Sequence, residues 1–399
     1  MAIDHLLEKL KRGLIPLSID NLRDAALSHT GLSYFTDPKL EESLQFLVDS
    51  CNSEAGLSII GRLAARQHLL ELLETRLKLI DYWQRTPEIQ EQEVFPQLFI
   101  TGMPKSASTF LHRLLGHDPD NRAPRMWEVM FPLPSPLCLR PDSDPRIGKA
   151  DRRLRWLAWS HPDLVKAHPV GAFIPHECGS ILGYSFESNV FLDMFSIPSY
   201  ETWLRNREME EAYEFHRSFL KHLQWQCPDK RWILKSSDHV HALKTLLKTY
   251  PEAKIIFLHR DPLKVLQAAS SQMTLLKKVF SSSINLRQLG AYETRTLSEK
   301  VKKVLEFRDA NPDLEDHFLD VRYLDLASDP VATVRAIYNR FGFPFSVAGE
   351  ALIKAFAENE RGKTRFDSYS LSDFTLGPEQ QSTQFDLYCE RFLVEREAL

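Results

Sequence analysis

The chain has few cysteines, no long apolar run, and no segment in which charges of one sign are concentrated. The 399 residues include 5 cysteines, which are widely separated and show no metal-ligand spacing. They predict unpaired thiols of a reducing compartment rather than a disulfide framework or a metal site. The formal net charge is −4 and no long basic run is present, which argues against nucleic acid as the principal partner.

No uncharged apolar segment is long enough to span a bilayer. The first residues, MAIDHLLEKLKRG, carry scattered charges and no apolar core of signal-peptide length. We therefore expect a cytoplasmic protein without a membrane span. No feature of the sequence indicates an oligomeric state.

The chain also lacks the ending of the phosphate loop found in nucleotide triphosphatases. The stretch LFITGMPKSASTFLHRLLGHDP, residues 98–119, predicts a short strand over 96–101, a turn, and a helix over 108–115. A triphosphatase would place a second glycine and Lys-Ser or Lys-Thr at the end of this loop. Here the lysine comes early, at Lys105, which argues against ATP and a bound Mg²⁺. A donor with one transferable group and no obligatory metal fits better.

The same loop has the residues of an anion site. Backbone N–H groups at a helix N-terminus attract a phosphate or sulfate group. The positions that would surround it are Lys105, Ser106, Ala107, Ser108 and Thr109. A purely structural turn is the competing interpretation of this loop taken alone.

The organisation of the chain predicts an α/β fold. Residues 1–92 repeat apolar positions at helical spacing and form an N-terminal helical region. From residue 93 to 399, strands alternate with helices, which implies a mostly parallel sheet covered on both faces. Residues from about 140 to 226 predict a helical insertion with interleaved aromatic residues.

Several segments of this region have a specific prediction. RWILK and KIIFLH are strands followed by helices, and HFLDVRYLDL (317–326) is expected to be a strand. The segment 124–145, PRMWEVMFPLPSPLCLRPDSDP, is too rich in proline for regular structure.

A second anion anchor follows the strand KIIFLH. Arg260 stands at its carboxyl end, directly before another helix, and a guanidinium there suits bidentate phosphate binding. A surface arginine that caps a turn would explain Arg260 alone. Two anion sites at two strand ends are harder to explain as packing, because open α/β sheets bind ligands at that edge.

With both loops in view, the chain resembles the sulfotransferases that use 3′-phosphoadenosine 5′-phosphosulfate. PKSASTFL is similar to their 5′-phosphosulfate loop, and FLHRDPLKVLQAASS is similar to their 3′-phosphate segment. RMWEVMFPLP, PHECGSIL, AYEFHRSFLKHLQW, RWILKSSDH and SYSLSDFTL resemble the mostly bacterial branch related to tyrosylprotein sulfotransferases. The resemblance covers roughly residues 95–390 and implies a P-loop-like sheet, with the insertion forming the acceptor pocket.

The resemblance implies roles for the donor-binding residues. Lys105 stabilises the charge that grows on the leaving 5′-phosphate, which explains its early place in the loop. The family glycine of this loop is Ala107 here, and the family serine after the arginine is Ala268. Ser271, on the same helical face, is the substitute for that serine.

Four more positions are candidate donor or site residues. Tyr323 is similar to the tyrosine placed near the adenine, and a core tyrosine is the alternative. Arg361 and Lys363, in ERGKTR, resemble the basic segment that reaches the 3′-phosphate, and a solvated face is the alternative. Lys235 is a candidate contact of the sulfuryl group, with a lysine at the edge of the core as the competing interpretation.

The acceptor hydroxyl must lose a proton, so a general base is expected. Glu128, in RMWEV, stands where the tyrosylprotein branch carries its catalytic glutamate, and a solvated acid is the alternative. His239, in LKSSDH, is the other candidate, with a structural hydrogen bond as its alternative. His176 and Glu177 are candidate lining residues of the acceptor pocket, or helix-packing residues.

These patterns together predict a sulfotransferase that moves a sulfuryl group to a hydroxyl of a small-molecule, lipid or carrier-bound acceptor, with no metal required. The aromatic segment between Trp156 and Trp225 indicates an apolar or amphipathic acceptor. Two alternatives stay open: a P-loop kinase, and a non-catalytic nucleotide-binding or scaffold module.

Overall fold

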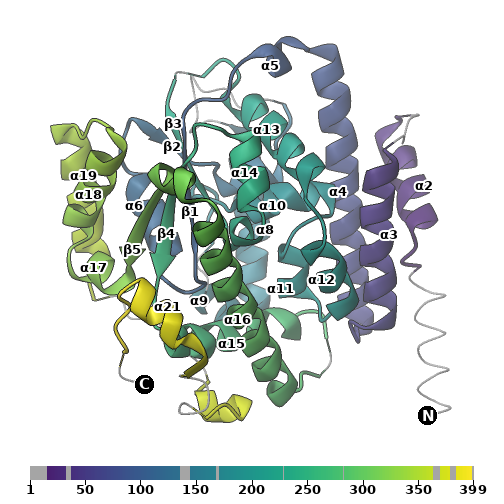
Figure 1. Ribbon diagram of the computed structural model, residues 1–399. Helices are drawn as coiled ribbons and strands as arrows, with labels where there is room; N and C mark the ends of the chain where they lie inside the picture. Colours follow the sequence, from purple (N-terminus) through teal and green to yellow (C-terminus); the bar gives the residue numbers. More distant parts are fainter. Residues whose placement is uncertain are drawn as a thin grey trace.

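Figure 1 shows a computed structural model of the chain. The structure describes residues 16–32, 37–134, 144–167, 170–227, 229–281, 283–362, 369–377 and 383–397.

The described chain contains a parallel five-stranded sheet. The strands are β1 (Gln97–Gly102), β2 (Asn121–Arg122), β3 (Arg231–Lys235), β4 (Lys254–His259) and β5 (Phe318–Arg322), in the order β2-β3-β1-β4-β5. β1 lies at the centre, paired with β3 on one side and β4 on the other. The carboxyl ends of these three strands therefore lie next to one another, where a ligand site of an α/β sheet is expected.

Side chains of the central strands alternate between two apolar layers. In β1, Leu98 and Ile100 join the layer made with α6, α18 and α19, whereas Phe99 joins the opposite layer. In β4, Ile256 and Leu258 face the first layer, since strand side chains alternate with a period of two. Helices cover both faces (Figure 1), and the predicted fold class is confirmed.

The long helices and short helical turns make up most of the rest of the described chain. Their bounds are α2 (Ile19–Thr30), α3 (Pro38–Ser53), α4 (Ile59–Arg85), α5 (Glu88–Glu91), α6 (Ser108–Leu115), α7 (Met126–Met130), α8 (Pro145–Ser160), α9 (Pro162–Ala167), α10 (Cys178–Leu182), α11 (Val190–Met194), α12 (Pro198–Arg205), α13 (Glu210–Gln224), α14 (Leu243–Thr249), α15 (Pro262–Lys278), α16 (Leu286–Ala310), α17 (Tyr323–Ser328), α18 (Pro330–Phe341), α19 (Val347–Glu360) and α21 (Asp386–Arg391).

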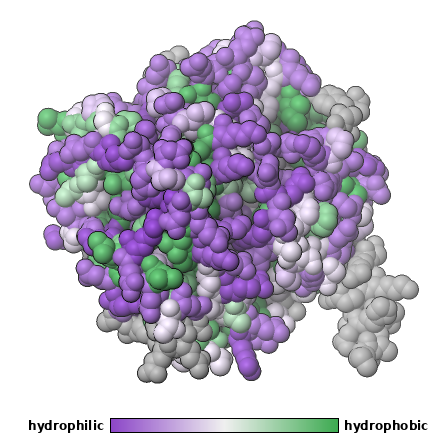
Figure 2. Space-filling model, viewed as in Figure 1, coloured by the Kyte–Doolittle hydropathy of each residue, from purple (hydrophilic) through white to green (hydrophobic). Residues whose placement is uncertain are grey.

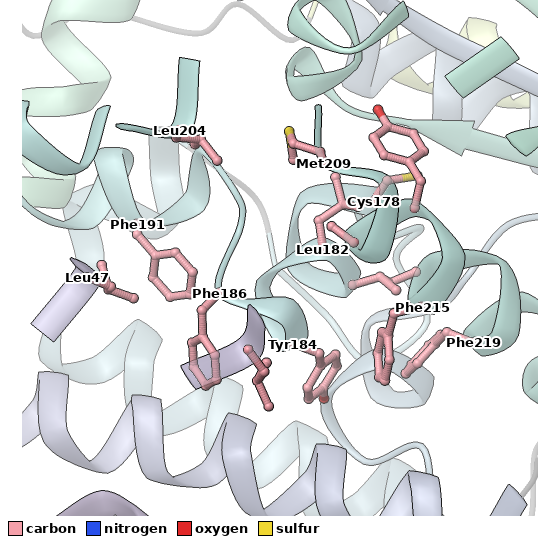
Figure 3. Close-up of a cluster of buried hydrophobic side chains, with 14 of the residues drawn as sticks. Leu47, Cys178, Leu182, Tyr184, Phe186, Phe191, Leu204, Met209, Phe215 and Phe219 are labelled. Atoms are coloured by element: carbon pink, nitrogen blue, oxygen red, sulfur yellow. The ribbon is translucent and has the colours of Figure 1, made fainter. Parts of the chain in front are cut away.

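The N-terminal helices share their core with the inserted helices. Figure 3 shows Leu47 of α3 near Phe186 and Phe191, with Tyr184, Phe215 and other side chains continuing the cluster. Leu69, Leu70 and Leu73 of α4 belong to the same cluster. The described helices of the regions predicted at 1–92 and 140–226 therefore share one apolar layer against one face of the sheet. The division of the chain at residue 93 stays a prediction.

Three local predictions were wrong. The strand expected at 317–326 ends at Arg322, and Tyr323 begins helix α17, where Leu326 is buried against the sheet. The proline-rich segment contains a short helix, α7, closed at its start by a capping box between Arg125 and Glu128. Cys227 is disulfide-bonded, although all thiols were expected to be unpaired.

Within the described residues, no helix is both long and apolar enough to cross a membrane. The face in Figure 2 is mainly hydrophilic, with hydrophobic residues in small separate patches.

Candidate active site

A cavity of about 930 Å³ opens at the carboxyl ends of β1, β3 and β4. Its wall takes residues from the loop after β1, from β3, and from α11, α15, α16 and α17. This is the edge of the sheet where the two predicted anion sites were expected to meet.

The loop after β1 has the backbone of an anion cradle. Gly102 adopts a φ of 122°, and a Cβ there would lie 2.3 Å from the carbonyl oxygen of Leu258, so only glycine fits. Lys105 and Ala107 also have positive φ values, 59° and 66°. The resemblance places a glycine at Ala107, and the left-handed backbone gives the physical reason for that preference. Alanine tolerates this conformation at a cost of about 1–2 kcal/mol.

Most of the predicted loop residues line the cavity. Lys105, Ala107, Ser108 and Thr109 are in its wall. Ser106 is not: its side chain is buried, and its hydroxyl donates to the carbonyl of Met103 at 2.5 Å. The hydroxyl of Ser106 therefore holds the loop together, and its predicted part in donor binding stays a prediction.

Arg260 lies in the same cavity wall and touches the loop. Its guanidinium donates to the backbone carbonyl of Lys105 at 2.7 Å and stacks 3.9 Å above the ring of Tyr323. It also forms a two-pronged ion pair with Glu397, with N–O distances of 2.8 and 3.0 Å. The structure thus brings the two predicted anion anchors into contact, and it couples one of them to the C-terminal segment.

The remaining described candidates for donor binding also line the cavity. Ser271 and Arg361 both line the cavity, and the Ser271 hydroxyl donates to the carbonyl of Tyr369 at 3.3 Å. Ala268, one helical turn before Ser271, lines it as well. Lys363 lies outside the described residues.

Lys235 and Glu177 form an ion pair in the wall of the cavity. The Lys235 ammonium contacts a carboxylate oxygen of Glu177 and donates to the Thr109 hydroxyl at 3.1 Å. The Lys235 side chain is 6% exposed, and that of Glu177 is 33% exposed. This pair lies directly beside the anion cradle, so it combines a cation with a carboxylate that solutes in the cavity can reach.

Glu128, one of the two predicted bases, is in a different environment. Its carboxylate is buried, accepts from the backbone N–H of Arg125 at 2.8 Å, and pairs with the Arg122 guanidinium at 3.0 Å. Glu128 is not among the described residues that line the cavity. The capping box and the ion pair account for this glutamate structurally, and its role as base stays a prediction.

His239, the other predicted base, is also away from the described cavity wall. The ring is buried, its Nδ1 is 2.7 Å from the Tyr213 hydroxyl, and its Nε2 has no hydrogen-bond partner among the described residues. Burial lowers the pKa of His239 well below its ordinary value, so the imidazole is neutral at physiological pH. Its catalytic role stays a prediction too.

The cavity continues past Lys235 into a polar recess that sequence reasoning missed. Asp193 and Glu293 line the wall there and interact electrostatically with Lys300. Arg205 also lines it and donates to the side-chain oxygen of Asn189 at 3.2 Å. Burial raises the pKa of Asp193 and of Glu293 to about 7 each. Burial lowers the pKa of Lys300 at the same time. We call Asn189, Asp193, Arg205, Glu293 and Lys300 the polar recess.

The apolar or amphipathic acceptor pocket expected from the aromatic segment stays a prediction. The aromatic side chains of that segment, such as Phe186, Phe191 and Phe215, are in the core with the N-terminal helices (Figure 3). A signal for the recess exists on α16, where Glu293 and Lys300 are seven residues apart and so share one helical face. Among the described residues, no cluster of three or more His, Cys, Asp and Glu side chains is arranged to hold a metal ion.

Comparison with known proteins identifies relatives of the chain. Two curated relatives, the omega-hydroxy-beta-dihydromenaquinone-9 sulfotransferases Stf3 of Mycobacterium bovis and Mycobacterium tuberculosis, are 25% identical over 262 residues. The alignment covers 62% of this chain and 63% of each relative, so the chain spans less than two thirds of their length.

Two solved structures agree with the chain over nearly all of its length. The sulfotransferase STF1 of M. tuberculosis H37Rv is 29% identical with a TM-score of 0.82, covering 92% of this chain and 98% of its own. STF9 of Mycobacterium avium is 25% identical with a TM-score of 0.88, covering 96% and 98%. The model of the sulfotransferase family matches residues 96–347. That match covers more than half of the chain, which therefore belongs to the sulfotransferase family.

Proposed function

We propose that the protein transfers a sulfuryl group from 3′-phosphoadenosine 5′-phosphosulfate to a hydroxyl of a small-molecule or lipid acceptor. The observation that carries the proposal is the contact between the two anion anchors: Arg260 donates to the carbonyl of Lys105 inside one cavity. A nucleotide with phosphates at its 3′ and 5′ positions has two anionic ends, and one cavity wall with two cationic anchors suits it.

The donor side of the cavity supplies electrostatic stabilisation. Sulfuryl transfer leaves negative charge on the 5′-phosphate, and Lys105 with the N–H groups of the cradle is placed to stabilise it. Arg260, Ser271 and Arg361 are the candidate ligands of the 3′-phosphate, with Tyr323 beside them. The loop suits the 5′-phosphosulfate group because the positive φ values of Lys105 and Ala107 shape a concave loop at the start of α6.

The acceptor side begins at the Lys235–Glu177 pair. We propose Glu177 as the group that takes the proton from the acceptor hydroxyl, because its carboxylate is in the cavity wall, whereas the carboxylate of Glu128 is committed to capping α7. Lys235, between Glu177 and Thr109, is placed to hold the transferred sulfuryl group.

We expect the part of the acceptor that enters the polar recess, near its reacting hydroxyl, to be polar. Carboxylates, an ammonium and a guanidinium line the polar recess, and such groups need hydrogen-bonding partners when a ligand displaces water. The named relatives act on a hydroxylated menaquinone derivative, which makes a lipid with a polar end one candidate class.

Thermal-shift titration tests the donor assignment. Adenosine 3′,5′-bisphosphate and ATP are each added with and without Mg²⁺, and ligand binding to the native state raises the melting temperature. We expect the bisphosphate to stabilise the protein without metal and more strongly than ATP. A larger, Mg²⁺-dependent shift with ATP would favour a kinase instead.

Turnover of the donor separates an enzyme from a nucleotide-binding module. The variant Lys105→Ala is expected to lose turnover while still binding the bisphosphate, and Lys302→Ala, at an exposed position of α16, serves as the matched control. A wild-type protein that binds the donor without turning it over, across a panel of hydroxyl acceptors, would support the scaffold alternative.

A further inference from the structure

Helix α8 carries two tryptophans that are largely exposed to solvent. Trp156 is 63% exposed and Trp159 is 80% exposed, whereas the other described tryptophans are buried or half-buried. Two indoles in this state leave on the order of 300 Å² of mainly apolar surface in contact with water. Apolar patches of a few hundred square ångströms on a folded protein are often functional.

The inner face of α8 is fixed, so the tryptophans are held in place. Ile147, Ala150 and Leu154 are buried, and the first two pack in a cluster with Trp127. On the flank of the helix, Arg153 forms an ion pair with Glu71 of α4 at 2.6 Å. The outer face of α8 is therefore a stable feature of the fold and not a fraying end.

The helix as a whole is basic, and two of its arginines lie on the outer face. α8 contains five basic residues and one acidic residue, although the whole chain has a net charge of −4. Arg152 lies four residues before Trp156, and Arg155 lies four residues before Trp159, so each pair shares one side of the helix. Neither arginine forms an ion pair with a described acidic side chain, and both are exposed. We call Arg152, Arg155, Trp156 and Trp159 the α8 face.

We propose that the α8 face docks the protein on the surface of an anionic lipid membrane. Tryptophan prefers the membrane–water interface, because its ring is apolar and its N–H still finds a polar partner there. Arginines beside it attract anionic lipid headgroups. A helix with this mixture on one side lies in the plane of the interface. A nucleic acid would favour a longer basic track than two unpaired arginines.

The docking face is structurally connected to the cavity. α9 follows α8 after His161 and packs against α15, whose residues Ser271 and Gln272 line the cavity. A protein held on a membrane by α8 would collect an acceptor from the lipid phase close to this helix pair. That consequence rests on the proposed function, whereas the docking itself does not.

Sedimentation with lipid vesicles tests the proposal without any donor or acceptor. The full chain is mixed with vesicles of phosphatidylcholine alone or of phosphatidylcholine and phosphatidylglycerol in equal parts. We expect binding to the anionic vesicles, a blue shift of tryptophan fluorescence, and release at high salt. Equal or absent binding to both vesicle types would overturn the proposal.

Variants locate the binding face. Since one basic side chain near an anionic surface contributes about a factor of five, Arg152→Ala with Arg155→Ala is expected to lower partitioning about thirtyfold. Trp156→Ala with Trp159→Ala should abolish the fluorescence shift.

The controls change other exposed positions by the same chemistry. Arg217→Ala with Lys248→Ala removes the same charge from α13 and α14, and Val347→Ala with Leu387→Ala trims apolar side chains elsewhere. Both are expected to bind like the wild type. If they lose binding equally, or if the α8 variants instead lose binding to duplex DNA and keep binding to vesicles, the assignment of a membrane partner is wrong.

Discussion

The replacement Glu177→Gln is the sharpest test of how the acceptor is activated. Glutamine keeps the size of the side chain and removes its charge and its basicity. If Glu177 takes the proton from the acceptor, turnover falls by about 10²–10⁴-fold. Binding of adenosine 3′,5′-bisphosphate, which involves the cradle and Arg260, is expected to change little.

The cost of this change to stability follows from the Lys235 pair. Removing one partner of a fully buried ion pair costs about 3–5 kcal/mol, because the other charge is left without compensation. Lys235 is 6% exposed and keeps its contact with Thr109, and Glu177 is 33% exposed, so water screens part of the interaction. We expect a loss of about 1–2 kcal/mol. Urea unfolding measures this loss and verifies that the variant is folded in the activity assay.

Glu128→Gln is the matched comparison, since it makes the same chemical change at the rival glutamate. Glutamine still offers an oxygen to the Arg125 N–H at the start of α7, but it leaves the buried Arg122 guanidinium without its charged partner. We expect a loss of about 1–3 kcal/mol in stability and turnover within a few-fold of the wild type.

The pair of variants gives a decisive outcome. Both are assayed by the release of adenosine 3′,5′-bisphosphate at saturating donor, with the folded fraction measured in the same buffer. If Glu177→Gln turns over near the wild-type value and Glu128→Gln loses most of its turnover, Glu177 is not the general base. That result would instead support Glu128, the base predicted from the sequence.

Three further changes test the donor loop, the C-terminal contact and the polar recess. Ala107→Gly relieves a left-handed alanine and is expected to raise the stability by about 0.5–1 kcal/mol; a lower melting temperature would contradict this. Glu397→Gln loosens the ion pair on Arg260 and should raise the affinity for adenosine 3′,5′-bisphosphate about three- to tenfold, whereas calorimetry showing no change would indicate that Arg260 does not bind phosphate. Burial raises the pKa of Glu293 to about 7, so the native state favours the protonated acid and stability falls as the pH rises from about 4.5 through 7. Glutamine does not titrate, so Glu293→Gln lacks this pH-dependent loss. In urea unfolding, the free energy of unfolding of the variant relative to the wild type should rise by about 2 kcal/mol from pH 5 to pH 8.

The sheet and the donor loop were predictable because their signals are local. Each strand, its turn and its helix are contiguous in the sequence, and apolar residues such as Ile100 and Ile256 mark strands buried on both faces. Once two such units are parallel, Lys105 and Arg260 must come to the same edge. They are also close together because β4 lies directly beside β1, although β2 and β3 intervene in the sequence. That strand order has no local signal, and the expectation of neighbouring strand ends came from the family resemblance.

Contacts between segments that are far apart in the sequence had no local sequence signal. Arg260 and Glu397 are 137 residues apart, and Lys235 and Glu177 are 58 apart. Charged residues on helix surfaces usually face solvent, so the shared helical face of Glu293 and Lys300 on α16 did not by itself indicate a cavity. The aromatic residues of the insertion indicated burial correctly, but periodicity does not distinguish a core from a pocket.

Under the proposed function, the two sides of the cavity differ in charge, and this difference would orient the two substrates. In that proposal, Lys105, Arg260 and Arg361 are the cations of the donor side, and Glu397 offsets part of the charge of Arg260. The polar recess offsets its cations with two carboxylates, so it does not compete for the anionic nucleotide. The Lys235–Glu177 pair lies at the boundary, where a cation can hold the sulfuryl group and a carboxylate can accept a proton. A donor bound backwards would place its phosphates against Asp193 and Glu293, and like-charge repulsion disfavours that orientation.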